Sequence, residues 1–430
     1  MTGLPWFDYR DGVLHAEGVN LHAIAEAVGT PAYVYSSDAL TRQYRSLADA
    51  FAGIDCLIAY AMKANSNLSV LRHFGSLGAG ADVVSGGELQ LAMKAGIPPG
   101  KIIFAGVGKT RAEMMLGLKA GNTGIAQFNV ESEAELQVLS EVASSLGVKA
   151  PVAIRINPDV DAKTHKKITT GKAENKFGIS YRRASEVYAL AAGLPGIEVV
   201  GVHVHIGSQL TDLAPYEDTF IRLAELVTAL RAAGHNIRRV DLGGGLGIRY
   251  DDETAPDPQL YAAMVRKHIL PLGIAVALEP GRFLVGNAGL LLTRVEYVKQ
   301  AEEKTFLILD SGMNDLIRPA MYEAFHRIVP VKAPENGAEL APVDIVGPIC
   351  ETGDTFAEGR PMPPVVAGDL LAILSAGAYS SAMASTYNAR PLAPEVLVHG
   401  DRFAIVRRRP SIDEMTALET MPGWFSEAQG

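Results

Sequence analysis

The sequence predicts an α/β protein made of a (β/α)8 TIM barrel and a mainly antiparallel β-barrel domain. Three observations support this prediction. Short apolar runs alternate with longer stretches of helical period from residue 54 to residue 281. After residue 285 the runs are shorter and are separated by Gly, Pro and Asp turns. The chain has 430 residues, 48% of them hydrophobic, and is therefore too long for one average domain.

Eight apolar or β-branched runs are expected to form the strands of the barrel. Parallel strands are covered on both faces and need a crossover helix, so they occur as apolar runs between helical stretches. The eight runs are Cys56 to Met62, Ala79 to Val84, Lys101 to Phe104, Gly124 to Phe128, Pro151 to Ile156, Val199 to His205, Arg239 to Leu242 and Ile274 to Leu278.

Two of the intervening stretches show helical period clearly. Glu131 to Leu146 and Tyr216 to Ala233 carry apolar residues at intervals of three and four. Gly147 and Gly234 follow these stretches and are expected to end the two helices.

The remaining runs predict the strands of the β domain. In the C-terminal region they are Leu290 to Val298, Thr305 to Leu309, Ala341 to Val346, Leu370 to Leu374 and Glu395 to His399. Val13 to His15 and Ala32 to Tyr35, near the N-terminus, are expected to join the same sheet. The predicted boundaries are therefore 36–285 for the barrel, and 1–35 with 286–430 for the β domain.

Charge and composition favour a small-molecule substrate. The formal net charge is −9, and the only basic clusters are short, which argues against a nucleic-acid or anionic-membrane surface. Cys56 and Cys350 are far apart and suggest no disulfide framework. The N-terminus lacks a basic region followed by an apolar one, and no segment of about 18 residues is apolar throughout. We therefore expect a soluble, cytoplasmic protein.

The residues at or just after the ends of seven predicted barrel strands are mostly polar. The active site of such a barrel lies at the C-terminal ends of its strands. The residues are Lys63, Asp82, Asn129, Asn157, His205, Gly243 and Glu279. Turn-forming Asn, Asp and Gly are common at strand ends, so each position alone is weak evidence. Seven together indicate a site.

The residues at this site suit pyridoxal phosphate, which needs an amine, phosphate donors and a partner for its pyridine nitrogen. Lys63 is the candidate amine, although Lys94, Lys109 and Lys176 also lie near loops. In Asp241 to Gly247, the glycines would let backbone N–H groups approach a phosphate. A flexible turn is the ordinary explanation of such a cluster.

Two further segments could complete the cofactor site. Glu279 facing the pyridine nitrogen would keep that nitrogen protonated, and the alternative is a salt bridge to Arg282. Gly281 and Arg282 are placed to meet a phosphate or a carboxylate. His203 and His205 alternate along one strand, and His205 is the better candidate to stack on the ring. A histidine of the core is the alternative there.

A turn in the C-terminal region could supply a proton donor. The segment from Gly347 to Asp354 places Cys350 beside two carboxylates, and Tyr379 follows Gly377 at the end of an apolar run. A thiol in this setting could donate a proton, or it could be a small buried apolar residue.

Taken in order, these motifs resemble the fold-type III pyridoxal phosphate decarboxylases, and most closely the diaminopimelate decarboxylase family of bacterial lysine biosynthesis. The resemblance spans nearly the whole chain. The matching segments are Tyr60–Asn65, Asp82–Glu88, His203–Gln209, Gly243–Gly245, Glu279–Arg282, Arg318–Tyr322, Cys350–Asp354 and Gly377–Tyr379.

The resemblance implies a role for each matching residue. Lys63 would bind the cofactor covalently, with His205 against its ring and Glu279 on its pyridine nitrogen. The other cofactor-binding residues would be Asp82, Ser208, Gly244, Gly281, Arg282 and Tyr379. The substrate would be bound by Arg282, Arg318, Tyr322, Glu351 and Tyr379. Cys350 would donate a proton, and its turn would complete the site of the other subunit in a homodimer. No metal is expected.

The implied reaction is decarboxylation of meso-2,6-diaminopimelate to L-lysine and CO₂. The substrate rests on Arg318–Tyr322 and on the loop Thr164–Gly171 leading to Lys176–Gly178, since an additional arginine with a tyrosine would bind the second amino acid centre. The alternatives are a decarboxylase of ornithine, arginine or carboxynorspermidine, or a pyridoxal phosphate racemase with a second base in place of the Cys350–Glu351 turn. A regulator without catalysis is disfavoured by the presence of Lys63, Glu279, Arg282 and Cys350.

Overall fold

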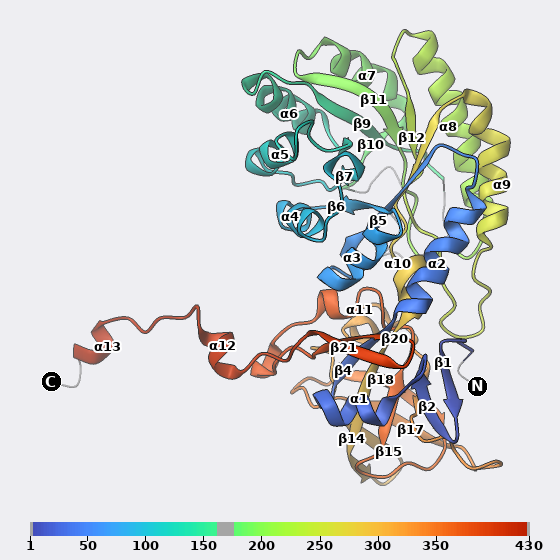
Figure 1. Cartoon of the computed structure of the whole chain (residues 1–430), viewed down its shortest axis with the longest axis vertical. Coiled ribbons are helices and arrows are strands. Elements are labelled where there is room, and N and C mark those ends of the chain that lie inside the picture. The colour runs from blue at the N-terminus through green and yellow to red at the C-terminus, as the bar shows by residue number, and fades with distance from the viewer. Residues whose placement is uncertain (1–2, 161–175, 428–430) are drawn as a thin grey trace.

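The computed structural model describes residues 3–160 and 176–427 and places a helix-covered barrel on a second, β-rich part (Figure 1). Each barrel strand pairs in parallel with the next, and the last pairs with the first, so the barrel is closed as predicted. Its strands are β5 (Cys56–Ala61), β6 (Gly80–Val83), β7 (Ile102–Phe104), β8 (Gln127–Val130), β9 (Ala150–Asn157), β11 (Ile197–His203), β12 (Arg239–Asp241) and β13 (Ala275–Leu278). The short β10 (Ile179–Ser180) is added beside β9.

A helix follows each barrel strand, and all but the last of these helices cover the outside of the barrel (Figure 1). These helices are α3 (Leu68–Ser76), α4 (Gly86–Lys94), α5 (Arg111–Leu118), α6 (Glu133–Ser145), α7 (Ala184–Gly193), α8 (Ala214–Ala232), α9 (Pro258–His268) and the short α10 (Arg282–Val285); α2 (Ser37–Ala50) precedes the first strand. The hydroxyl of Ser132 accepts a hydrogen bond from the Glu135 backbone and so caps the start of α6. Gly147 and Gly234, with φ of 69° and 91°, follow α6 and α8, which confirms both predicted helix ends.

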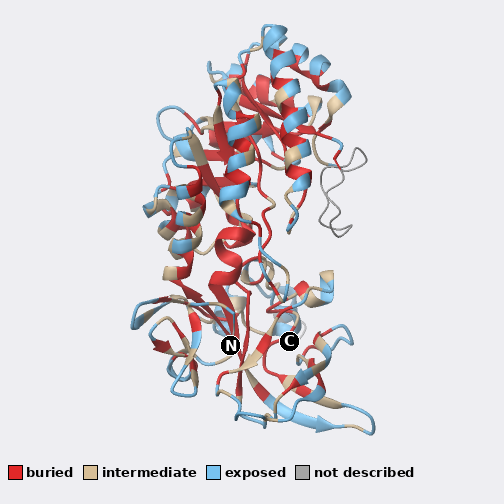
Figure 2. Ribbon diagram, turned by 90° about the vertical axis from the view of Figure 1, so that its right-hand side faces the viewer, coloured by how far each residue is buried: buried red, intermediate tan, exposed pale blue. Residues whose placement is uncertain are grey.

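The strands and the inner faces of the helices form one large buried core (Figure 2). Strands β6, β7 and β8 are buried at every position. Because full burial of a Val, Leu, Ile or Phe side chain contributes roughly 1.5–3 kcal/mol, this core fixes the strand ends on which the polar residues stand.

The second part contains a sheet of nine strands that is mainly antiparallel, as predicted. Two pairs are parallel, β15 with β17 and β4 with β20. The strands are β4 (Ala32–Ser36), β14 (Gly289–Gln300), β15 (Thr305–Leu309), β16 (Ile328–Pro330), β17 (Ala341–Val346), β18 (Thr355–Met362), β19 (Leu370–Ile373), β20 (Glu395–His399) and β21 (Arg402–Arg407). The helix α11 (Arg318–Tyr322) lies between β15 and β16.

The run from Val13 to His15 does not join this sheet. It forms β2 (Val13–Ala16) in a separate antiparallel sheet with β1 (Phe7–Arg10) and β3 (Val19–Asn20), ahead of α1 (Leu21–Val28). Asp11 and Gly12 both have positive φ, so a tight turn pairs β2 with its neighbour in sequence. The small sheet still contacts the second part, because the Leu14 N–H donates to the Val331 carbonyl at 2.7 Å.

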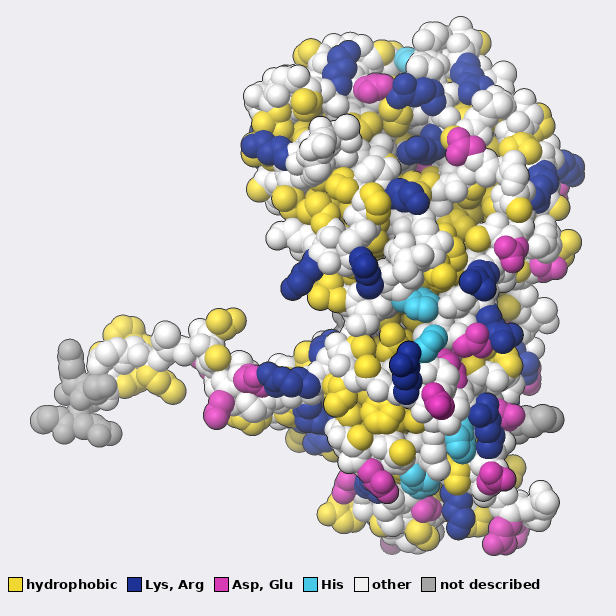
Figure 3. All heavy atoms as spheres, viewed as in Figure 1, with side chains coloured by type: hydrophobic (Ala, Val, Ile, Leu, Met, Phe, Trp, Pro, Cys, Tyr) yellow, Lys and Arg dark blue, Asp and Glu magenta, His cyan; other side chains and the backbone are white. Residues whose placement is uncertain are grey.

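An arm extends from the second part beyond β21 (Figures 1 and 3). It carries α12 (Ile412–Thr416) and α13 (Trp424–Glu427). Leu418 and Met421 on this arm are 97% and 88% exposed, and Trp424 and Phe425 are also exposed. Within residues 3–160 and 176–427, no helix combines the length and apolar character needed to cross a membrane.

Candidate active site

Lys63 lies directly after β5, where the chain turns away from the barrel. Its Nζ is 3.1 Å from Oδ2 of Asp82, which is fully buried on the neighbouring strand β6. The Lys63 side chain is 39% exposed, so the amine is held by the acid and remains open on its other side. Burial lowers the pKa of Lys63, but the Asp82 carboxylate and then Tyr379 and Glu279 outweigh burial and raise it.

Glu279 follows β13 and is buried inside the mouth of the barrel. Its Oε1 accepts a hydrogen bond from Nδ2 of Asn129 at 2.9 Å. Its Oε2 is 3.3 Å from Nε2 of His203, without the alignment of a hydrogen bond. Burial and then the Asp82 carboxylate raise the pKa of Glu279 to about 8. The alternative salt bridge to Arg282 does not form, because that guanidinium binds other partners.

The glycine cluster after β12 is packed against the end of β13. Gly243 and Gly245 have φ of 66° and 104°, which favours glycine at both positions. Gly244 needs glycine for a different reason, since a Cβ there would lie 2.2 Å from the carbonyl oxygen of Glu279. The Gly244 N–H donates to Nδ1 of His205 at 3.2 Å, so the loop and the histidine hold each other.

His205 stands two residues past the end of β11 and is half-buried. Burial, followed by the positive charge of Arg155, lowers the pKa of His205 well below its ordinary value. A neutral ring whose Nδ1 is already bonded suits stacking on a flat aromatic ligand. His203 differs, because it is fully buried against Glu279.

Arg282 is the first residue of α10, and its guanidinium contacts three side chains from different segments of the chain. Its Nη1 donates to the Tyr250 hydroxyl at 2.6 Å and its Nη2 to Oγ of Ser208 at 3.2 Å. The guanidinium lies 4.8 Å from the ring centroid of Tyr379. The Tyr379 N–H donates to the carbonyl of Ala64 at 2.8 Å, so a loop of the second part reaches the segment that carries the amine.

Gly281, just before this helix, packs on the segment around Lys63. A Cβ at Gly281 would lie 3.2 Å from the Cβ of Ala61 and of Ala64. The glycine cluster Gly243–Gly245, the Lys63 amine and Arg282 therefore lie at the same end of the barrel.

Arg318 is buried beside the same site. Its guanidinium is 4.6 Å from the ring centroid of Tyr250, and Nη1 donates to Nε2 of His326 at 2.7 Å. The other ring nitrogen of His326, Nδ1, donates to the carbonyl of Leu374 at 2.8 Å. Tyr322 on the same helix is half-buried and acts electrostatically on both arginines.

Cys350 and Glu351 are not brought to this cluster within one chain. Both residues are exposed. The Cys350 N–H donates to Oδ1 of Asn388 at 3.0 Å, and Glu351 accepts a hydrogen bond from the Tyr387 hydroxyl. Within the described ranges, no hydrogen bond or ion pair joins Cys350 or Glu351 to Lys63.

The alternative lysines lie in other surroundings. Lys109 is buried in an ion pair with Glu135. Lys176 is exposed and contacts the Phe177 ring, and Lys94 ends α4. The loop from Thr164 to Gly171 lies outside the described residues.

Several contact residues were missed from the sequence. Tyr250 and His326 belong to no motif and follow no predicted barrel strand. Gln127 and Asp241 line the buried floor beneath Glu279. Asp241 had a usable signal, because it is a charged residue within the predicted strand Arg239 to Leu242, two positions before the glycine cluster.

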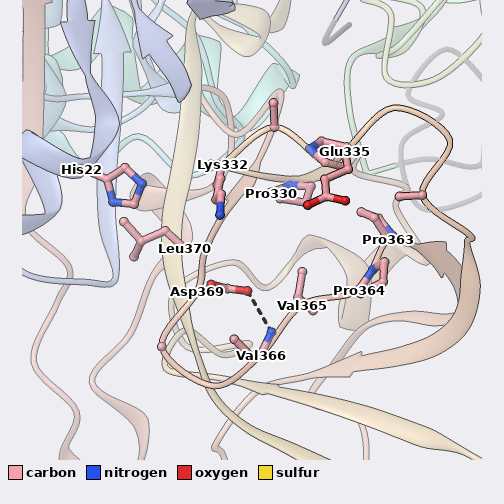
Figure 4. A pocket seen from close by; sticks show the side chains of 14 residues that line it. His22, Pro330, Lys332, Glu335, Pro363, Pro364, Val365, Val366, Asp369 and Leu370 are labelled. Carbon is pink, nitrogen blue, oxygen red and sulfur yellow. Dashed lines mark hydrogen bonds between the residues drawn. The ribbon is translucent and has the colours of Figure 1, made fainter. Parts of the chain in front are cut away.

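A separate hollow of about 440 Å³ lies in the second part, between β16, β19 and the loops beside them (Figure 4). Lys332 and Glu335 in its lining are exposed, and Asp369 already accepts a hydrogen bond from the Val366 N–H. The hollow contains none of the predicted site residues, so it is not the candidate active site.

The donor set at the barrel mouth fits pyridoxal phosphate. It offers an accessible amine, a neutral histidine, a buried carboxyl group and a glycine loop into which no Cβ would fit. Oδ1 of Asp82 and Nε of Arg282 are buried without a hydrogen-bond partner, so they could still bind a ligand.

Comparison with known proteins gives concordant results. Residues 37–286 match the family described as "Pyridoxal-dependent decarboxylase, pyridoxal binding domain". Diaminopimelate decarboxylase of Pseudomonas aeruginosa is 52% identical over 96% of this chain and 99% of that protein. The enzyme of the same name from Aquifex aeolicus is 48% identical over 95% and 96%.

Solved structures agree in fold. Diaminopimelate decarboxylase from M. jannaschii in co-complex with L-lysine has a TM-score of 0.92 at 39% identity, covering 98% of this chain and 99% of that one. The Helicobacter pylori enzyme complexed with L-lysine has a TM-score of 0.88 at 41% identity, covering 93% and 99%.

Proposed function

We infer that this chain, which belongs to the family of pyridoxal-dependent decarboxylases, converts meso-2,6-diaminopimelate to L-lysine and CO₂. The single observation that carries the substrate is the near-complete coverage by relatives named diaminopimelate decarboxylase. The chain is therefore an enzyme of lysine biosynthesis, and pyridoxal phosphate is its cofactor.

Lys63 is proposed to bind the cofactor covalently. Its raised pKa keeps the amine protonated near neutral pH, so a proton must leave before the nitrogen can attack an aldehyde. Oδ2 of Asp82, at 3.1 Å, is within reach of that proton. When bound, the cofactor supplies an electron sink for the electrons left behind by departing CO₂.

The remaining cofactor contacts are assigned by chemistry. The Gly244 backbone, the Gly281–Arg282 segment and Tyr379 would hold the phosphate, with Ser208 nearby. His205 would lie against the ring face. Glu279 would take the ring nitrogen, since a buried carboxyl group with a raised pKa can share a proton with a pyridine.

Arg318 is proposed to bind the carboxylate of the distal amino acid centre. A substrate with two such centres needs an anion partner beyond the reacting carbon, and a planar guanidinium suits a carboxylate. Tyr322, Glu351, Arg282 and Tyr379 would complete the substrate contacts. CO₂ would leave from the D-configured carbon.

We further propose that the working enzyme is a homodimer with shared sites. Cys350 and Glu351 are exposed, and the hydrogen bonds from the Cys350 N–H to Asn388 and from the Tyr387 hydroxyl to the Glu351 carboxylate hold them on their own part of the chain. A second copy could bring this turn to the mouth of the barrel, where the Cys350 thiol would give its proton to the carbon that lost CO₂ and regain one from water. The exposed apolar side chains of the arm also favour a partner chain.

Two further proposals concern organisation and location. The chain is divided into a barrel of residues 36–285 and a β domain of residues 1–35 and 286–430, which is supported by the separation of the barrel strands from the nine-stranded second sheet. A cytoplasmic location is supported by two unpaired cysteines, Cys56 and Cys350. Limited proteolysis and cell fractionation test these proposals.

The deciding experiment is CO₂ release from meso-diaminopimelate with and without added pyridoxal phosphate. Cofactor-dependent release with formation of L-lysine is expected. Ornithine, arginine and carboxynorspermidine are tested in parallel. Faster decarboxylation of any of them would contradict the assignment of meso-diaminopimelate as the substrate. The Lys63→Ala protein should lose the visible absorbance of the bound cofactor, and an unchanged spectrum would remove Lys63 from its role.

A further inference from the structure

Asp241 is fully buried beneath Glu279 and has no part in the chemistry described so far. Its Oδ2 accepts hydrogen bonds from Nε2 of Gln127 and Nδ2 of Asn129, each at 3.0 Å. Its Oδ1 accepts from the Gly243 N–H at 3.0 Å. Both oxygens therefore serve as acceptors, which suits a charged carboxylate.

Asn129 connects Asp241 to Glu279. Its Nδ2 donates to Asp241 and also to Oε1 of Glu279 at 2.9 Å. Its Oδ1 accepts from Nε2 of Gln127 at 2.7 Å, which fixes the direction of the amide. The NH₂ group is therefore turned toward both carboxyl groups, and it ties the orientation of Glu279 to Asp241.

His203 bounds the cluster on the other side of Glu279. The side chains of His203, Asp241 and Glu279 meet here. One nitrogen or oxygen atom from each lies within 4.8 Å of the other two. Burial, which outweighs the attraction of Asp241, lowers the pKa of His203 to about 4. The neutral imidazole brings no positive charge to the two acids, and burial and then Glu279 raise the pKa of Asp241 to about 7. The Asp241–Glu279 pair therefore holds on to a proton near neutral pH.

We propose that Asp241 is a positioning residue that acts on the ring nitrogen of the cofactor through Asn129 and Glu279. Its negative charge, close to Glu279 and away from water, stabilises a proton held between Glu279 and that nitrogen. This inference rests on the proposed function of Glu279. Lys63, Asp82 and Arg155 also act on Glu279, whereas Asp241 acts on it both directly and through the shared Asn129 amide.

An asparagine cannot replace Asp241. The amide has one acceptor oxygen, whereas Asp241 accepts on both sides. In one orientation the new NH₂ would face the Gly243 N–H, and in the other it would face the side-chain amides of Gln127 and Asn129. In both cases a donor opposes a donor, and the negative charge is lost as well.

The test measures the affinity of the apoprotein for two ligands, pyridoxal phosphate and an analogue in which carbon replaces the ring nitrogen. We expect Asp241→Asn to weaken binding of pyridoxal phosphate about tenfold, as for the loss of one charge near a proton site. Binding of the analogue should weaken clearly less, because it has no ring nitrogen to protonate and shares only the loss caused by the opposed donors. Equal weakening for both ligands would mean a merely structural role and would overturn the inference.

Two further variants guard against misfolding. Asn129→Ala removes the amide between Asp241 and Glu279 but keeps the Asp241 carboxyl group. It should therefore weaken binding of pyridoxal phosphate less than Asp241→Asn does, and it should leave binding of the analogue little changed. Asp315→Asn is the matched control, since this carboxyl is buried in the second part, where its Oδ2 accepts a hydrogen bond from the Gly312 N–H. It should keep the wild-type ratio of the two affinities. If Asp241→Asn fails to fold by circular dichroism, an equal loss for both ligands in Asn129→Ala overturns the inference.

Binding to the wild-type protein distinguishes a failure of the Asp241 assignment from a failure of the Glu279 assignment. If wild type binds both ligands equally, Glu279 does not serve the ring nitrogen, and both assignments fall. If wild type prefers pyridoxal phosphate and Asp241→Asn keeps the same preference, the assignment of Asp241 alone fails.

Discussion

Arg318 owes its position to a histidine that no motif marks. His326 donates through Nδ1 to Leu374 and accepts through Nε2 from the guanidinium, so its tautomer is fixed by its two partners. Burial and then the Arg318 charge lower the pKa of His326 to about 3. The neutral ring is thus a built-in acceptor that holds a proposed substrate residue in place.

Replacing His326 with phenylalanine should weaken substrate binding. The variant leaves Arg318 without its acceptor while filling a similar volume. We expect KM for meso-diaminopimelate to rise about tenfold with kcat little changed, because the lost contact serves ground state and transition state alike. His326→Gln retains an acceptor and should restore most of the affinity. A fall in kcat at unchanged KM would contradict this assignment.

His326 should also make the fold sensitive to acid. Its folded pKa lies below the ordinary value of 6.5, so its contribution to stability is present above pH 6.5 and is lost as the pH falls toward 3. Urea unfolding at pH 7 and at pH 4.5 gives the loss of free energy of unfolding on acidification. This loss should be smaller in His326→Gln than in wild type by about 2 kcal/mol. Identical losses in the two proteins would exclude His326 as a source of the effect.

Cys350 can be tested without disturbing the cofactor. Its side chain is exposed, and its backbone N–H donates to Asn388 in the second part, away from Lys63. Cys350→Ala should keep the absorbance of bound pyridoxal phosphate and slow turnover on the order of 100-fold, the usual contribution of a general acid. Wild-type turnover in this variant would exclude the thiol as the proton donor.

At the scale of elements, the contact between the glycine loop and the end of β13 is the most exacting. A Cβ at Gly244 would lie 2.2 Å from the Glu279 carbonyl oxygen, which is backbone and cannot move aside alone. Gly244→Ala should therefore lower stability by about 1–3 kcal/mol and weaken pyridoxal phosphate binding, measured by thermal unfolding and titration. Gly193→Ala is the control, since it has open space and lies at the end of α7. Equal melting temperatures for the two variants would contradict this account.

The sequence predicted strands well and missed those with weak patterns. All eight barrel strands were recognisable, because burial on both faces leaves a run of apolar residues. β10 has only two residues, too few for any period. β18 carries Glu358 and Arg360 on an exposed stretch and so lacks an apolar run. The separate sheet of β2 depended on local turns, which a search for apolar runs does not weigh.

The site itself was only partly visible from sequence. Lys63, Asp82 and Glu279 could be found because they stand where barrel strands end. Their mutual contacts could not, since Asn129 and Glu279 meet across 150 positions of the chain. His326 and Tyr250 come from loops whose placement depends on tertiary packing, so no spacing rule could reveal them.

At the scale of the whole molecule, shared sites make a distinctive prediction. Lys63→Ala and Cys350→Ala disable the two halves of one proposed site, and in a mixed dimer both defects fall in the same site. The other site of that dimer is intact. Mixing the two inactive or slow proteins after dissociation should restore roughly one quarter of the wild-type rate, as random pairing requires. If the mixture shows only the average of the two variants, each chain carries its own complete site.

The place of β4 in the second sheet has a consequence for synthesis of the protein. This strand is buried throughout and lies between β14 and β20, which are both encoded after the barrel. A ribosome adding about 5–20 residues per second therefore leaves its two edges unpaired for on the order of ten seconds or more. During that interval, the nascent chain exposes an apolar strand that invites aggregation, so chains that end before β14 should depend on chaperones.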